Sequence, residues 1–219
     1  MANTMKLVAI IFIILSFLEQ GSVKCQEVWT LRKEKNGIKV LTHKNKNYKF
    51  DEIEVECEFE GRISQLAALL LDVDNQYLWV YKTLKSTLIK RVNPADVFFY
   101  TEIDCPWPYE NRDLIVHMSI AQNPVNKVMT IIANNAEGVL PDKKDITRVK
   151  YSRAVWTITP LINNKFKIDY KVQIDLGPDI PAWLLNMFSS NAPYETFMNL
   201  KEKIKLPQYV KAKFPFLLD

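Results

Sequence analysis

The sequence predicts an α+β domain in which a curved antiparallel β-sheet of eight or nine strands wraps around one long C-terminal helix. Three observations lead to this prediction. Many short runs alternate apolar and polar residues with a period of two, as half-buried strands do. An apolar stripe of helical period follows them at about 181–205, and no linker-like composition separates the two parts. Because one face of such a sheet is dry, the long helix is expected to cover it.

The first 25 residues have the pattern of a secretory signal peptide. Lys6 precedes an apolar run at 7–18, and a polar stretch follows that run. This run is too short to span a bilayer as a helix but fits the apolar region of a signal. We expect cleavage near Cys25–Gln26, with a retained membrane anchor as the alternative. The protein is then exported and works in the periplasm, the cell envelope or outside the cell.

The N-terminal part of the mature chain predicts strands and then a helix. Asn36-Gly37 is a strong hairpin signal between two strand-like runs. Residues 51–60 alternate glutamate with apolar side chains, which indicates a half-buried strand with an acidic face in water. Residues 63–80 change to helical spacing, and the cluster at 72–75 is expected to end that helix.

Further strands lead to the C-terminal helix. They are predicted over 84–92, 97–104, 113–122, 127–134, 150–159 and 165–176. The helix is expected from Pro181 to Lys205, with Pro181 at its first position and Asp179 as a cap. Pro193 must kink or break it, because proline removes a helical hydrogen bond. The tail at 207–219 follows the domain, which we place at 26–206.

Composition excludes several classes of function. A net charge of +4 is too mild to indicate a nucleic-acid partner. Only 5 glycines occur and neither common phosphate-loop motif is present, which excludes nucleotide binding by those loops. His43 and His117 are the only histidines, so we expect no metal and no cofactor. Cys57 and Cys105 are either a disulfide or two buried thiols.

A curved sheet that grips one helix leaves a space too wide for side chains alone to fill, so we expect an apolar ligand cavity inside. Its wall is expected to contain large inward-facing aromatic residues, namely Phe98 or Phe99, Tyr100, Trp156 and Tyr170. Plain core packing is the alternative for each of them.

Several motifs, taken in order, resemble a START domain, the lipid-transfer module related to the steroidogenic acute regulatory protein. They are WTL at 29–31, NGIKV at 36–40, LLLDVDNQYLWV at 69–80, PWPYENRD at 106–113, WTITP at 156–160 and DLGPDIPAWLLN at 175–186. The resemblance covers about 27–205 and points to an exported, bacterial-type member. It implies a helix-grip (START/Bet v 1-like) fold with one lipid-sized tunnel, closed by the C-terminal helix and neighbouring loops.

This reading predicts binding, and transfer, of a lipid or other hydrophobic small molecule without catalysis. The loop at 106–113 and the first turns of the C-terminal helix are expected to gate the tunnel and to touch a membrane surface transiently. We expect a monomer. The residues predicted to contact the ligand are Tyr100, Glu102, Trp107, Tyr109, Arg112, Arg153, Trp156, Tyr170, Trp183, Leu184, Met187 and Phe188.

Two other functions stay open from the sequence. One is a helix-grip enzyme of the cyclase or aromatase type, which needs a general acid or base; the available groups are Glu102, Asp104, Arg153 and Asp169. The other is an interaction module with a filled core. Arg112 and Asp113 have two readings as well: a structural clamp of the loop, or, for Arg112, a ligand for a lipid head group.

Overall fold

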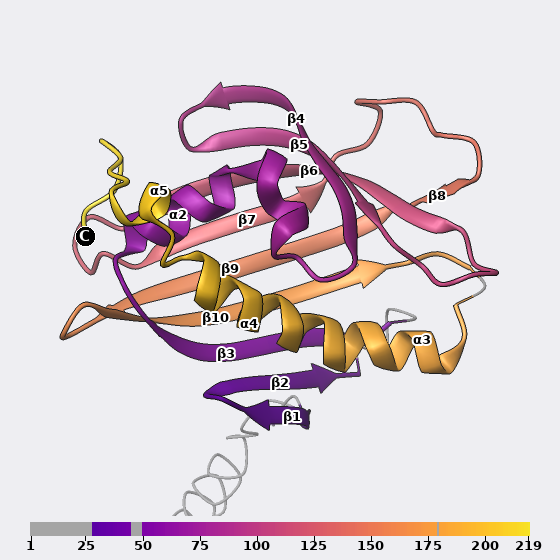
Figure 1. Ribbon diagram of the computed structural model, residues 1–219, viewed down its shortest axis with the longest axis horizontal. Helices are drawn as coiled ribbons and strands as arrows, with labels where there is room; N and C mark the ends of the chain where they lie inside the picture. The colour runs from indigo at the N-terminus through magenta and orange to yellow at the C-terminus, as the bar shows by residue number, and fades with distance from the viewer. Residues whose placement is uncertain (1–27, 45–49, 179) are drawn as a thin grey trace, which may run out of the picture.

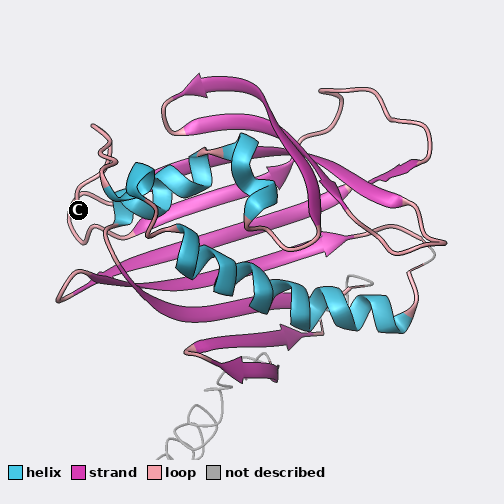
Figure 2. Ribbon diagram, in the orientation of Figure 1, coloured by secondary structure: helices cyan, strands magenta, loops and turns pink. Residues whose placement is uncertain are grey.

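The computed structural model describes residues 28–44, 50–178 and 180–219. The predicted signal peptide and the predicted cap Asp179 lie outside these residues. The described part is a large sheet with all its helices on one face (Figure 2). This arrangement confirms the predicted α+β class.

The sheet has ten strands in the order β1-β2-β3-β10-β9-β7-β6-β5-β4, with β8 paired to β6 (Figure 1). Their bounds are β1 Trp29–Lys35, β2 Ile38–His43, β3 Glu52–Glu60, β4 Thr83–Asn93, β5 Asp96–Ile103, β6 Asn111–Gln122, β7 Met129–Asn135, β8 Ile146–Arg148, β9 Tyr151–Leu161 and β10 Lys165–Asp175. Neighbours along the main path are antiparallel, whereas β8 runs parallel to β6. The strand missed by the sequence is β8, which is too short to show a period of two.

The helical segments lie across the concave face of the sheet (Figure 1). They are α2 Ile63–Leu71, the 3₁₀ helix η1 Val73–Leu78, α3 Ala182–Asn186, the π-helical turn η2 Met187–Asn191, α4 Ala192–Lys203 and α5 Pro207–Val210. The predicted helix at 63–80 is thus two helices, and it changes at Asp72 as expected.

Pro193 neither breaks nor interrupts the C-terminal helix. The helix continues from α3 through η2 into α4, and Pro193 lies in the first turn of α4. A π-helical turn contains one more residue than an α-helical turn. The turn η2 comes directly before Pro193, whose ring would clash with the preceding turn of a regular α-helix. The widened turn η2 therefore accommodates the proline.

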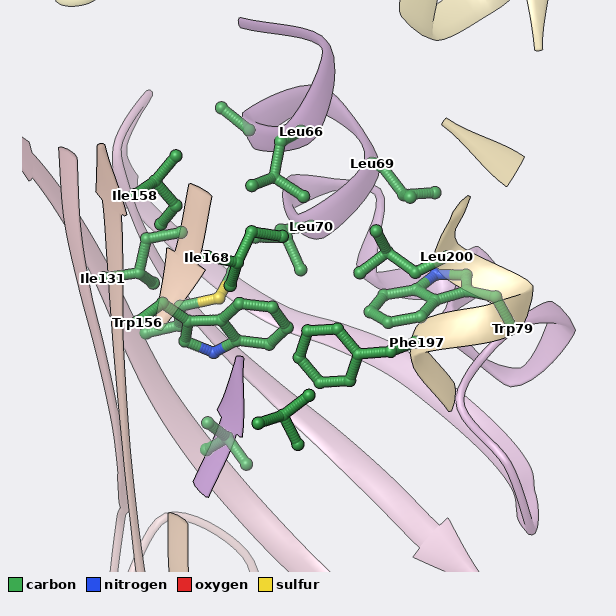
Figure 3. Packing of buried hydrophobic residues seen from close by; sticks show 14 of the residues in the cluster. Leu66, Leu69, Leu70, Trp79, Ile131, Trp156, Ile158, Ile168, Phe197 and Leu200 are labelled. Atoms are coloured by element: carbon green, nitrogen blue, oxygen red, sulfur yellow. The ribbon is translucent and has the colours of Figure 1, made fainter. Parts of the chain in front are cut away.

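The core lies between the sheet and these helices (Figure 3). The strands contribute Ile131, Ile158 and Ile168, while Leu66 and Leu70 come from α2. The same inward face of β10 carries Phe166, as the alternation predicted. Cys57 and Cys105 are buried free thiols and are not bridged to each other, and burial raises the pKa of both.

The tail beyond 206 is tied to α2. Asp219 accepts hydrogen bonds from the backbone amide and the hydroxyl of Ser64, at 2.9 and 2.8 Å, and from Arg62 at 2.7 Å. These bonds satisfy donors at the beginning of α2, which otherwise lack partners within the helix. The hydroxyl of Tyr209 donates to Asp72 at the other end of α2, at 2.7 Å.

Tyr209 gives the fold a measurable dependence on alkaline pH. Burial, followed by the hydrogen bond to Asp72, raises the pKa of Tyr209 from 10.0 to about 12. The folded protein keeps this proton above pH 10 while the unfolded chain loses it, so the free energy of unfolding falls as the pH rises from about 10 to 12. We expect a smaller fall in Tyr209→Phe, measured by urea denaturation across this range. Equal falls in both proteins would contradict the assignment.

Candidate functional site

A cavity of about 260 Å³ lies between the sheet and the helices. We call it the central cavity. Its sheet side is formed by residues of seven strands: Ile53, Thr83, Phe99, Thr101, Ile103, Leu114, Val116, Met118, Ala133, Ser152, Ala154, Trp156, Tyr170, Val172 and Ile174. Its helical side is formed by residues of α2, η1, η2 and α4 and of the segment after η1, including Leu70, Gln76, Trp79, Val80, Phe188, Pro193, Thr196 and Phe197.

Three aromatic rings make up one wall of the central cavity. Trp156 and Tyr170 are direct partners on β9 and β10, and their ring centroids are 4.4 Å apart. Phe197 of α4 lies 5.3 Å from Trp156 and 5.4 Å from Tyr170, so it joins the helix to the sheet (Figure 3). Such tilted and offset rings add to the stabilisation that burial alone provides.

Two alanines open the space beside this wall. Ala133 of β7 and Ala154 of β9 stand directly opposite each other in the sheet, and both line the central cavity. A pair of large residues at these positions would fill part of the volume. The small side chains are therefore one reason why the core contains a cavity here.

The polar groups of the central cavity are few and neutral. No charged side chain belongs to the lining residues of the described chain. Gln76 donates its amide to the carbonyl of Leu70 at 3.1 Å, and Thr196 accepts from the backbone of Tyr81 at 3.0 Å. Burial raises the pKa of Tyr170, so its hydroxyl stays protonated. The arrangement can hold an apolar molecule and offers it a few hydrogen bonds, but no ionised acid or base.

Arg112 clamps the loop at 106–110 onto the segment before α3. It is buried, its Nε and Nη2 donate to the carbonyls of Leu176 and Pro178 at 3.1 Å each, and its Nη1 donates to the carbonyl of Glu110. Arg112 does not line the central cavity. The geometry agrees with the clamp reading, and it does not bring this guanidinium to a ligand inside.

Asp113 forms the second half of the clamp. Its carboxylate is fully buried and accepts two hydrogen bonds from Arg148, at 2.6 and 3.2 Å. Arg148 also donates to the carbonyls of Leu140 and Pro141, so it holds the long loop before β8. The sequence did not indicate this partner, because it lies on a three-residue strand that pairs with β6 in parallel.

Of the residues predicted to contact a ligand, Trp156, Tyr170 and Phe188 line the central cavity. Leu184 is completely buried in the hydrophobic core and is not among the lining residues. The structure thus brings three of these positions together. Their role in binding a ligand stays a prediction.

The predicted gate residues lie at the surface. Tyr109 of the loop and Trp183 of α3 contact each other edge to face, with centroids 6.2 Å apart. Trp183 and Met187 line a separate surface pocket of about 380 Å³. Trp107 of the same loop is 92% exposed.

Tyr100, Glu102 and Arg153 were expected inside and lie outside. Tyr100 and Glu102 are on the face of β5 opposite Phe99, where the Tyr100 hydroxyl donates to Glu102 at 3.0 Å and Lys143 donates to that hydroxyl at 2.8 Å. Arg153 is exposed between two residues that line the central cavity. The physical reason is that side chains alternate between the two faces of a strand. Residues 98–100 are all aromatic, so the sequence does not show which of them face inward, and of these three Phe99 lines the cavity.

Sequence reasoning missed Trp79, Ala133, Ala154 and Thr196 as lining residues. Phe197 had been placed on the apolar stripe of the helix but was not assigned to the cavity. Strand parity was the available signal for the alanines, since Ala154 lies two residues before Trp156. Trp79 follows η1, where no period indicates which way a side chain points. Its indole Nε1 is buried and has no hydrogen-bond partner within the described residues.

The four groups named for the enzyme alternative are dispersed. Asp104 pairs with Lys82 at 2.6 Å, and Asp169 pairs with Lys167 at 2.7 Å. Glu102 binds Asn111 and Tyr100. None of these carboxylates, nor Arg153, lines the central cavity, so the structure brings none of them to a substrate held there.

Nowhere in 28–44, 50–178 and 180–219 do three or more histidine, cysteine, aspartate or glutamate side chains gather in a way that would hold a metal ion. In the same ranges, no helix has the length and apolar character needed to cross a membrane.

Comparisons with known proteins agree with this architecture. No family model matches the chain. An uncharacterized protein of Pseudomonas aeruginosa is 26% identical over 175 residues, which are 80% of this chain and 86% of that protein.

Among solved structures, a STAR-related lipid transfer protein from Xanthomonas axonopodis has a TM-score of 0.74 at 23% identity, over 81% of this chain and 99% of that one. Human STARD10 has a TM-score of 0.71 at 20% identity, over 83% and 75%. Human StAR-related lipid transfer protein 5 has a TM-score of 0.69 at 15% identity, over 93% and 96%. The chain therefore shares the fold of these solved structures, which is the predicted helix-grip fold.

Proposed function

We propose that this protein binds a lipid or another hydrophobic small molecule in the central cavity and transfers it between membranes, without catalysis. The observation that carries the proposal is an apolar cavity of about 260 Å³ with no charged side chain among its described lining residues. Burial of a lipid tail contributes about 0.8 kcal/mol per CH₂ group, so apolar area alone can provide the affinity. The similar structures whose names describe lipid transfer support the same function.

Uptake of lipid from vesicles tests this proposal. Purified protein is incubated with phosphatidylcholine vesicles, separated from them and extracted, and the bound lipid is identified and counted by mass spectrometry. We expect bound lipid in the wild type. We expect Ala154→Phe to lower the amount of bound lipid at least about tenfold, because a benzyl group at this position occupies the cavity. The free energy of unfolding should fall by no more than about 3 kcal/mol, the usual cost of overpacking.

Ala121→Phe is the matched control for Ala154→Phe. Ala121 is exposed on β6, so the same substitution there leaves the central cavity unchanged. If Ala154→Phe takes up as much lipid as the wild type and unfolds at a similar temperature, the lipid does not occupy this cavity. A wild type that binds no lipid at all would refute the function itself.

The loop at 106–110 and α3 form the gate in this proposal, and they contact the membrane. Trp107 and Trp183 are 92% and 54% exposed, and tryptophan side chains suit the boundary between lipid and water. The Tyr109–Trp183 contact connects the loop to the helix and would open to admit a ligand. The signal-like pattern of residues 1–25 supports work in the periplasm, the cell envelope or outside the cell, and we propose that the protein acts as a monomer.

Transfer rates between vesicles test the gate. We expect Trp107→Ala/Trp183→Ala to slow the transfer of a fluorescent lipid while the fold stays intact, because two side chains that enter the interface are lost. Ile162→Ala is the control, since this residue is 83% exposed in the turn between β9 and β10, at the opposite end of the sheet from α3 (Figure 1). Unchanged transfer by the double variant would exclude a gate at these tryptophans.

A further inference from the structure

Two outer pockets lie on the side of η2 that faces β1 and β2, and one of them adjoins the central cavity. A side pocket of about 170 Å³ shares the walls Ile53, Ile174 and Phe188 with the central cavity. The same side pocket shares Arg32 and Ser189 with the surface pocket of about 380 Å³. The three spaces therefore follow one another, with Phe188 between the apolar interior and a polar entrance.

Arg32 is the charged residue common to both outer spaces, and the backbone places it there by a local irregularity. The pairing of β1 with β2 shifts by one residue between Leu31 and Lys33, which leaves Arg32 as the additional residue of a β-bulge. Bulges redirect a side chain that regular alternation would point elsewhere, and they are frequent beside binding sites.

The guanidinium of Arg32 makes one side-chain hydrogen bond within the described residues. Its Nε donates to the hydroxyl of Thr42 at 3.0 Å. Its Nη2 lies 3.9 Å from the carboxylate of Asp51, which is an ion pair too long for a hydrogen bond. Within the described residues neither Nη donates a hydrogen bond, and Asp51 is the anion beside the guanidinium.

Other groups at the entrance also suit an anion. Side chains of Asn186, Ser189 and Asn191 line the surface pocket beside Arg32. The ammonium group of Lys33 donates to the amide oxygen of Asn191 at 3.4 Å, and it lies 4.0 Å from the carboxylate of Glu195, which offsets its charge. Two adjacent Nη groups match the two oxygens of a carboxylate or phosphate, which lysine cannot do with the same geometry.

We propose that Arg32 binds the anionic head group, carboxylate or phosphate, of a lipid whose tail passes Phe188 into the central cavity. This inference rests on the proposed function and specifies the class of its ligand. Phe188 stands on the π-helical turn η2, and π turns occur frequently at functional sites. The charge stays at the half-exposed entrance, where Arg32 keeps 37% of its side chain accessible, while the tail occupies the uncharged interior.

Four labelled lipids, each added to phosphatidylcholine vesicles, test this inference. Dioleoylphosphatidate and oleate are anionic, and dioleoylglycerol and oleyl alcohol carry the same tails without the charge. We expect the wild type to take up at least one anionic lipid in preference to its uncharged counterpart. Arg32→Gln is expected to lower uptake of that anionic lipid about tenfold or more, since charge-assisted hydrogen bonds are lost, and to change uptake of the uncharged one less than about twofold.

Two further variants sharpen the comparison. Arg153→Gln removes the same charge from an exposed position on β9 and is expected to leave all four uptakes unchanged. Arg32→Lys keeps the charge but not the pair of Nη groups, so we expect an intermediate loss. Preference for phosphatidate or for oleate identifies the head group as phosphate or carboxylate.

Uptake of the uncharged lipids at the level of the anionic ones, or an equal effect of Arg32→Gln on both, would overturn the role of Arg32 and leave the proposed function standing. Failure of the wild type to take up any of the four lipids would instead overturn both.

Discussion

Replacing Arg148 with methionine is expected to lower the free energy of unfolding by about 3–5 kcal/mol. The substitution leaves the carboxylate of Asp113, which is 0% exposed, without the two hydrogen bonds it accepts from Arg148. A buried charge that loses its partner keeps the cost of desolvation and loses the attraction that offset it. Urea denaturation at neutral pH measures the change.

Two variants separate the buried charge from other effects of Arg148→Met. Lys165→Met removes a cation from a surface pair with Glu60, 4.0 Å away, and should cost less than about 1 kcal/mol. The double variant Asp113→Leu/Arg148→Met removes both charges and should be more stable than Arg148→Met alone. A double variant that is no more stable than the single one would show that the loss comes from the loop carbonyls that Arg148 holds.

Phe197→Ala is expected to cost about 3–5 kcal/mol of stability. Phe197 is 1% exposed, and its ring contacts both Trp156 and Tyr170, so its removal enlarges the central cavity and separates α4 from the sheet. Neighbouring side chains cannot collapse into the space easily, because the cavity already exists beside them. The free energy of unfolding in urea gives the result.

Phe98→Ala is the matched control for Phe197→Ala. Phe98 stacks on His117 on the outer face of the sheet, with centroids 4.2 Å apart, and is only partly buried. We expect its loss to cost about 1 kcal/mol or less, as for an exposed aromatic pair. Similar losses for the two phenylalanines would mean that the wall of the central cavity contributes little to the stability of the fold.

The two proposals for the site make different demands on the molecule. Lipid binding in the central cavity requires only its apolar volume, whereas the role of Arg32 requires a route to the surface beside η2. Both depend on the C-terminal helix, because α4 supplies Phe197 to the interior and η2 supplies Phe188 to the boundary. Movement of α4 and η2 would therefore affect both binding and release of the ligand.

Much of the fold follows from local patterns. The alternation at 165–176 predicted β10 and the burial of Phe166, and the apolar stripe at 181–205 predicted a helix that covers the sheet. These predictions succeed because a period of two or 3.6 residues is a property of the chain itself. The clamp was one of the two readings that the sequence left open for Arg112 and Asp113, and the hydrogen bonds of both residues agree with it.

Other features depend on contacts between distant segments. Alternation identified β5 as a strand but not which side faces inward, so Tyr100 and Glu102 were placed in the cavity although Phe99 and Thr101 line it. The bulge at Arg32 arises from the register between β1 and β2. The partner of Asp113 comes from a strand of three residues, and the cavity itself exists because small residues on two strands meet opposite one helix. Local periodicity groups the side chains of a strand into two faces, but the register of the strand and the face that packs inward are settled by pairing and packing over long sequence distances.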